Sequence, residues 1–89
     1  MPITKDLEIK NIKGLHARAA AAFVKIAENF QSTIEVERIG LTVSGLSIMG
    51  LMMLSASKGT SIKVKIAGDD EKKAMEAITK LIDNKFGEE

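Results

Sequence analysis

The only histidine of the chain lies in the run Gly14-Leu15-His16-Ala17-Arg18, two residues before an arginine. Residues 17–30 contain no glycine or proline, and the spacing of their apolar residues predicts a helix that starts directly after the histidine. That apolar face consists of Ala20, Phe23, Val24, Ala27 and Phe30. A helix start has unpaired backbone N–H groups and a partial positive charge, which together favour a bound anion. The run is therefore predicted to hold a phosphoryl group.

The residue types of this run suit phosphoryl chemistry. The positive helix start disfavours a charged imidazole, so His16 is expected to keep a ring nitrogen free for attack. Arg18 can bond two phosphoryl oxygens at once, and the backbone N–H groups of Ala17 and Arg18 are the predicted phosphate ligands. Gly14 allows a backbone turn that other residues resist. The alternative is that His16 is an ordinary surface residue.

Composition limits the classes of function. The 89 residues make one domain, residues 1–89, and the net charge of +1 with no Trp or Tyr gives no reason to expect nucleic-acid binding. There is no cysteine and one histidine, so no metal site or other cofactor is expected. The N-terminal residues lack the apolar stretch of a signal peptide, and no segment is long enough to span a membrane. We expect a cytoplasmic monomer.

A second informative segment follows Ser47. Residues 48–54 are an apolar run with one glycine, which predicts a short helix whose first N–H groups are capped by the Ser47 hydroxyl. Such a helix buries one face, and Leu51 and Leu54 are the expected buried pair. The apolar residues left exposed predict a surface on which partner proteins dock, for which methionine is well suited. The predicted docking residues are Ile48, Met49, Met52 and Ala20.

The remaining segments alternate between apolar and polar residues, which predicts strands at residues 3–12, 33–39, 41–43 and 60–67. A last helix is expected after Asp69 and Asp70, with acidic residues at its positive end. A sheet of alternating strands exposes one face to solvent and buries the other, and amphipathic helices can bury their apolar faces against that second face. The prediction is an α+β fold, an open-faced β-sandwich of order βαββαβα with three helices on one face of a four-stranded antiparallel sheet.

The run GLHAR at the start of an amphipathic helix resembles the active-site signature of the histidine-containing phosphocarrier (HPr) family of the bacterial phosphoenolpyruvate-dependent phosphotransferase system. The segment Ser47-Ile48-Met49-Gly50-Leu51-Met52 resembles the regulatory-serine segment of family members in bacteria that have an HPr kinase/phosphorylase. One position departs from the family, because Ala19 stands where proline is usual. Its loss is expected to make the first helical turn slightly less rigid.

The resemblance implies a carrier rather than an enzyme. Enzyme I would transfer a phosphoryl group to Nδ1 of His16, and His16 would pass it to an enzyme IIA. Phosphorylation of Ser47 would hinder that transfer. The first two helices would lie near each other, which would place His16, Arg18 and the Ser47 helix on one surface.

Two alternatives remain open. Three segments are similar to a nitrogen-related, regulatory branch of the family that transports no sugar: Leu51-Met52-Met53-Leu54, Lys58-Gly59 and the ending Phe86-Gly87-Glu88-Glu89. In contrast, Ser47-Ile48-Met49-Gly50 is similar to the kinase-regulated branch. The other alternative is a small α+β binding or assembly module without covalent chemistry.

Overall fold

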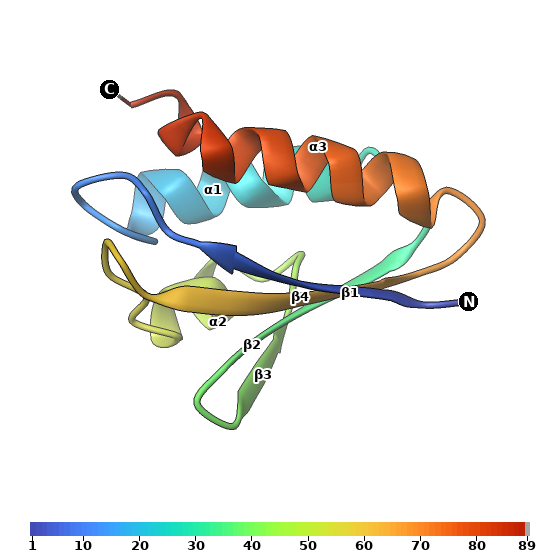
Figure 1. The fold of residues 1–89 in the computed structure, drawn as a ribbon, viewed down its shortest axis with the longest axis horizontal. Helices are drawn as coiled ribbons and strands as arrows, with labels where there is room; N and C mark the ends of the chain where they lie inside the picture. The colour runs from blue at the N-terminus through green and yellow to red at the C-terminus, as the bar shows by residue number, and fades with distance from the viewer. Residues whose placement is uncertain (89) are drawn as a thin grey trace.

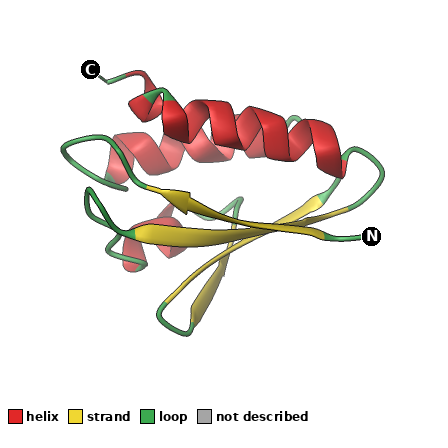
Figure 2. Cartoon of the chain, viewed as in Figure 1, coloured by secondary structure: helices red, strands yellow, loops and turns green. Residues whose placement is uncertain are grey.

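In the computed structural model, which describes residues 1–88, four strands and three α-helices follow one another, with a short 3-10 helix after them (Figures 1 and 2). In chain order they are β1 (Ile3–Glu8), α1 (Ala17–Ala27), β2 (Thr33–Arg38), β3 (Leu41–Ser44), α2 (Ile48–Met53), β4 (Ser61–Ala67), α3 (Glu71–Asp83) and η1 (Lys85–Gly87). The predicted order βαββαβα is confirmed.

The strands form one antiparallel sheet of order β1-β4-β2-β3. Figure 1 shows α1 and α3 covering one face of this sheet, and α2 packs against α1 and β3. The alternating apolar side chains of the strands are buried. The buried strand residues are Leu7, Ile34, Val36, Ile62, Val64 and Ile66. Leu51 and Leu54 belong to the same core, so the predicted arrangement of helices on one face is confirmed.

The opposite face of the sheet carries charged residues of both signs. Glu35 lies across from Lys65, and Glu37 lies across from Lys63. Opposite charges on neighbouring strands contribute about 0.2–1 kcal/mol per pair. One face is therefore open to solvent, as the alternation predicts.

The sequence prediction was wrong about the length of β1, which ends at Glu8 rather than near residue 12. Ile9 still bonds to the neighbouring chain segment, because its N–H donates to Thr60 O at 2.8 Å and its carbonyl accepts from Gly59 N at 2.8 Å. The chain then turns, with Gly14 N donating to Asn11 O at 3.1 Å. The helix α1 also ends at Ala27, three residues before the predicted end.

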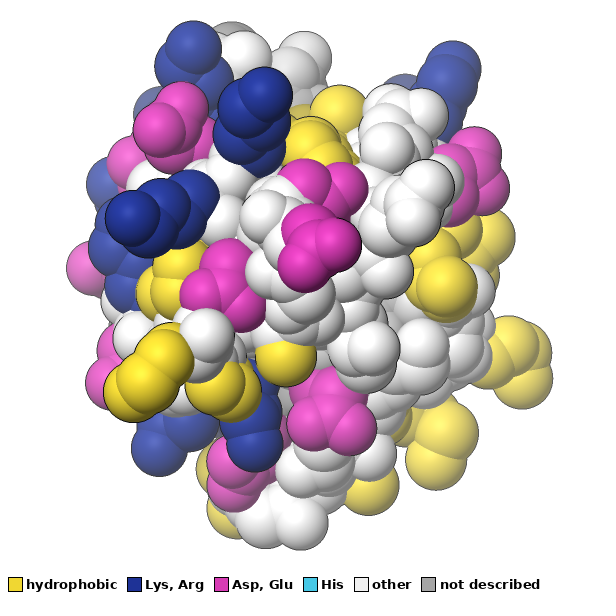
Figure 3. Space-filling view, turned by 90° about the vertical axis from the view of Figure 1, so that its right-hand side faces the viewer, with side chains coloured by type: hydrophobic (Ala, Val, Ile, Leu, Met, Phe, Trp, Pro, Cys, Tyr) yellow, Lys and Arg dark blue, Asp and Glu magenta, His cyan; other side chains and the backbone are white. Residues whose placement is uncertain are grey.

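The surface at the N-terminal end of the molecule carries mixed charges and does not contain the candidate histidine (Figure 3). Figure 3 shows the end of the molecule at which the N-terminus lies, where Lys and Arg are intermixed with Asp and Glu and no histidine is visible. None of the helices in residues 1–88 is long and apolar enough to cross a membrane. The candidate site lies at the other end of the molecule.

Candidate functional site

His16 is the residue that immediately precedes α1. Its backbone is extended, with φ −84° and ψ −176°, and its carbonyl accepts the first helical hydrogen bond from Ala20 N at 2.8 Å. Its side chain makes no capping bond and is 25% exposed. The predicted helix start is confirmed, and the imidazole is left available because the backbone alone begins the helix.

The loop before His16 is fixed against the segment that follows α2. Leu15 N donates to Ala56 O at 2.8 Å, and the Leu15 side chain is buried. Gly14 has φ +67°, and a Cβ there would lie 2.5 Å from Ala56 O. Only glycine combines this left-handed backbone with so close an approach. The helices α1 and α2 are in contact, so the family expectation that they lie near each other is confirmed.

Arg18 lies in the first turn of α1 and is exposed. Together with Lys13, it lines a concave surface whose other lining residues are Ile12, Ala22, Phe86, Gly87 and Glu88. Two cationic side chains thus flank the segment that holds the histidine. Within residues 1–88, no group of three acidic or histidine side chains is placed to bind a metal ion.

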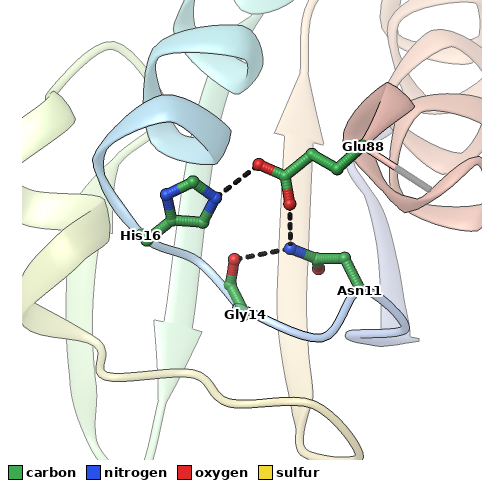
Figure 4. Close-up of polar contacts among 4 residues, drawn as sticks. All are labelled: Asn11, Gly14, His16 and Glu88. Atoms are coloured by element: carbon green, nitrogen blue, oxygen red, sulfur yellow. Dashed lines mark hydrogen bonds and ion pairs between the residues drawn. The ribbon is translucent and has the colours of Figure 1, made fainter.

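A carboxylate from the end of the chain contacts the histidine (Figure 4). One oxygen of Glu88 contacts Nε2 of His16, and its Oε1 accepts from Asn11 Nδ2 at 2.9 Å. Asn11 Nδ2 also donates to Gly14 O at 2.8 Å. Sequence reasoning missed both Asn11 and Glu88. The position of Asn11 near Gly14 is only a weak indication of a role in the site. No local pattern indicates the contact between Glu88 and His16, which are 72 residues apart.

Electrostatics keep Glu88 ionised. Burial raises the pKa of its carboxyl group, but the hydrogen bonds from Asn11 and His16 outweigh this effect, together with the charge that His16 carries when it is protonated and the permanent charge of Arg18. The resulting pKa lies below the ordinary value for glutamate. At neutral pH, Glu88 is therefore an acceptor of hydrogen bonds and not a donor.

The predicted cap of α2 is confirmed, because Ser47 Oγ accepts from Gly50 N at 2.9 Å. Leu51 and Leu54 are buried as expected. The exposed side chains around α2 include two that were not predicted as docking residues, Leu46 and Met53. We call the α2 apolar group the set Leu46, Ile48, Met49, Met52 and Met53, which are 59%, 41%, 73%, 41% and 65% exposed.

The docking role predicted for Ala20 is wrong. Its side chain is 0% exposed and belongs to the core, beside Ala19 and Phe23 on the inner face of α1. A residue on the apolar stripe of a helix faces the core rather than a partner. Ala19 is also buried, so the side chain that stands in the place of the family proline is packed inside the protein.

Comparison with known proteins identifies the family. A family model described as the PTS HPr component phosphorylation site matches residues 3–84. The chain belongs to the HPr family. Phosphocarrier protein HPr of Neisseria meningitidis serogroup B is 48% identical over 86 residues, covering 97% of each chain, and that of Xylella fastidiosa Temecula1 is 45% identical over 84 residues, covering 94% of each.

Solved HPr structures have the same fold. The crystal structure of HPr-C-His from Thermoanaerobacter tengcongensis matches with a TM-score of 0.93 and 48% identity over 98% of each chain. The crystal structure of an HPr dimer from the same organism matches with a TM-score of 0.78 and 50% identity over 92% of this chain and 94% of that one. The open-faced sandwich is therefore the HPr fold.

The HPr family match includes His16, Arg18 and Ser47, but it ends at residue 84. Asn11 lies inside the matched range and Glu88 lies beyond it. The contact between Glu88 and His16 thus joins the part of the chain that defines the family to a segment outside it.

Proposed function

We propose that the chain is a phosphoryl carrier in which His16 accepts a phosphoryl group from phosphorylated enzyme I and donates it to an enzyme IIA. The observation that carries this proposal is the state of the His16 side chain. It stands at the start of α1 without capping it, and among residues 1–88 its Nδ1 has no hydrogen-bond partner. Membership of the HPr family supports the same conclusion.

The helix start supplies the ligands for the transferred group. The first N–H groups of a helix have no acceptor within it, so those of Ala17 and Arg18 are available to phosphoryl oxygens on Nδ1. The exposed guanidinium of Arg18 adds a forked positive charge. In a loose transition state, such positioning and charge do most of the work, and no metal ion or cofactor of this chain is required. The chain is a carrier and not an enzyme.

The α2 apolar group is the proposed surface for partners. Its side chains are exposed on a short helix that contacts α1, so a protein seated there would lie beside His16. A small apolar surface suits rapid exchange between enzyme I and enzyme IIA. We propose that the protein works as a cytoplasmic monomer. The acceptor decides whether the relay serves sugar uptake or nitrogen-related regulation, since both use the same histidine.

The relay is tested by labelling the protein with enzyme I, magnesium and phosphoenolpyruvate, and by measuring its intact mass. The expected result is a gain of one phosphate at neutral or alkaline pH that brief acid treatment removes. His16→Ala should gain none while keeping its thermal melt. Ser47→Ala is the matched control and should still accept the acid-labile phosphate. Labelling of His16→Ala would contradict the proposal and favour a binding module.

We further propose that phosphorylation of Ser47 by an HPr kinase/phosphorylase is a switch. The Ser47 hydroxyl is partly exposed and lies at the start of α2, next to Ile48 and Met49. A doubly charged phosphate at this position is tolerated by the helix start but repels an acidic or apolar partner.

The switch is tested with a variant that carries a negative charge at the same place. Ser47→Asp should weaken enzyme I binding about tenfold, as measured by titration calorimetry. Ser61→Asp places the same charge on an exposed serine of β4 and should leave the affinity unchanged. Equal weakening by the two variants would mean that net charge alone is responsible, and the switch would be rejected.

A further inference from the structure

We propose that Asn11 and Glu88 select the nitrogen of His16 that is phosphorylated, because they hold the imidazole as the Nε2–H tautomer and leave the lone pair on Nδ1. This inference rests on the proposed phosphocarrier function. It makes Asn11 and Glu88 positioning residues, which act through His16 and do not touch the phosphoryl group.

The geometry of the contact fixes the proton. Figure 4 shows Nε2 of His16 directed at the carboxylate of Glu88, while the other ring nitrogen lies on the far side of the ring. An ionised carboxylate only accepts hydrogen bonds, so Nε2 must carry the hydrogen. In a neutral imidazole, the other nitrogen then has the free lone pair. Nδ1 is therefore the nucleophile, and the carboxylate blocks Nε2.

Asn11 makes this arrangement rigid. The two hydrogens of its amide go to Gly14 O and to Glu88 Oε1, so one side chain ties the loop before His16 to the carboxylate. Asn11 is 0% exposed, and its Oδ1 is buried without a hydrogen-bond partner among residues 1–88. A buried unpaired oxygen is destabilising. The amide is thus explained by its two donated bonds rather than by packing.

The chemistry of transfer gives Glu88 a second effect. The Nδ1 lone pair forms the new bond to phosphorus, and the bond between phosphorus and the donor nitrogen breaks, returning its electron pair to the donor. His16 keeps its Nε2 proton, so its phosphorylated ring carries a positive charge, which the adjacent carboxylate stabilises. When the phosphoryl group leaves, the electron pair returns to Nδ1 and the ring is neutral again. Glu88 takes no proton in either direction.

The same charge opposes reaction at the other nitrogen. A phosphoryl group on Nε2 would occupy the place of the Glu88 carboxylate and would face its negative charge. Arg18 lines the same concave surface as Glu88, so its charge alone does not distinguish the two nitrogens, and it is the carboxylate of Glu88 that closes the Nε2 side. The arrangement thus favours Nδ1 both by the position of the proton and by repulsion.

The test combines nitrogen NMR of the ring with transfer kinetics on the full chain. In protein containing ¹⁵N-histidine, the ring shifts should report the Nε2–H tautomer, and the phosphorus coupling of the phosphorylated protein should report Nδ1. Glu88→Ala should shift the tautomer toward a mixture, slow phosphorylation by enzyme I about tenfold, and yield a detectable Nε2 adduct. Glu88→Gln keeps the shape without the charge and should have a smaller effect.

Two further variants separate positioning from general effects. Asp83→Asn removes a carboxylate from the end of α3, where it bonds to Lys10 at 2.9 Å, and should behave as the wild type. Asn11→Ala should move the tautomer in the same direction as Glu88→Ala, with its loss of stability measured separately by unfolding.

The outcomes distinguish this inference from the function on which it rests. Absence of phosphate on the wild-type protein would overturn the carrier function itself, and the selection of Nδ1 with it. Normal phosphorylation of the wild type, with unchanged tautomer and rate in Glu88→Ala, would overturn only the role of Asn11 and Glu88.

Discussion

Two carboxylates, those of Asp70 and Glu88, connect distant segments of the chain at opposite ends of the molecule. Asp70 precedes α3 and accepts hydrogen bonds from Gln31 N at 2.9 Å, Ser32 N at 3.0 Å and the Ser32 hydroxyl. Glu88 follows η1 and accepts from Asn11 while it contacts His16. Because α3 runs between them, the two groups lie at opposite ends of that helix (Figure 1). Each joins the C-terminal part of the chain to the region of α1.

Both carboxylates have a pKa below the ordinary value, for different reasons. The Ser32 hydroxyl is the main cause for Asp70, followed by the backbone N–H of Gln31. For Glu88, burial raises the pKa, and the bonds from Asn11 and His16 overcome it. The partners of Asp70 have no chemistry of their own, whereas one partner of Glu88 is the proposed phosphoryl acceptor. If the proposed function is correct, the same kind of contact stabilises the fold at Asp70 and serves phosphoryl transfer at Glu88.

A glycine lies near each of these contacts, Gly14 beside the Asn11 that bonds Glu88, and Gly68 two residues before Asp70. Replacing either glycine is expected to give the largest losses of stability. A Cβ at Gly14 would lie 2.5 Å from Ala56 O, and one at Gly68 would lie 2.5 Å from the Ser32 hydroxyl. Both residues have positive φ, +67° and +152°. Gly14→Ala and Gly68→Ala should each lower the free energy of unfolding by about 3 kcal/mol, as measured with denaturant.

Only Gly14→Ala should also slow phosphoryl transfer, because it displaces the loop that carries His16. Gly59→Ala is the matched control, since Gly59 has φ +90° and a Cβ added there would meet nothing within 4 Å. That substitution should cost only about 1 kcal/mol. If Gly68→Ala slowed transfer as much as Gly14→Ala, a disturbance at the Asp70 end would affect transfer as strongly as one at the Glu88 end, and the distinction between the two ends would be wrong.

Replacing the carboxylates themselves should have smaller effects than replacing the glycines, but should distinguish the two ends more clearly. Asp70→Asn replaces an acceptor of three hydrogen bonds by an amide, so its thermal midpoint should fall by about 5 °C while its rate of phosphorylation stays that of the wild type. Glu88→Ala should show the reverse balance, a clearly slower rate with a smaller fall in the midpoint than that of Asp70→Asn. A shared phenotype in both assays would contradict the assignment of one carboxylate to stability and the other to transfer.

The sequence predicted what local spacing determines. Alternation in β4, with Ile62, Val64 and Ile66 buried, and the spacing of apolar residues in α1 were sufficient to predict these two elements. The GLHAR run was sufficient to place His16 and Arg18 at the start of a helix, because the residues of a helix start are adjacent in sequence. The cap at Ser47 was predictable for the same reason.

The predictions were wrong or missing where contacts between distant segments determine the structure. Ala20 is buried because the inner face of α1 packs into the core, which composition alone does not distinguish from a contact surface. The strand β1 ends at Glu8 because the chain must turn before Gly14 to reach the helix start. Glu88 contacts His16 across 72 residues, and no pattern in either segment indicates that pairing. The local position of His16 was therefore predictable, while its contact with Glu88 was not.

Acid titration is expected to give the smallest effect and to test both carboxylates at once. Each has a lowered pKa in the folded protein, so folding favours its ionised form. The resulting stabilisation is complete above the ordinary carboxyl pKa values of about 4, and it is lost as the pH falls through the lower values of the folded state. Stability measured by denaturant unfolding should therefore fall less between about pH 6 and about pH 3 in Asp70→Asn combined with Glu88→Ala than in the wild type.

Because the two groups lie at opposite ends of α3, the changes in acid sensitivity of the single variants should add in the double variant. Additivity would mean that the two ends titrate independently, so acid could release the contact with His16 without loosening the Asp70 end. A double variant as sensitive to acid as the wild type would show that other carboxylates dominate acid unfolding. In that case the lowered pKa of Glu88 would matter only for the histidine that it contacts, and its effect would be visible in transfer rather than in stability.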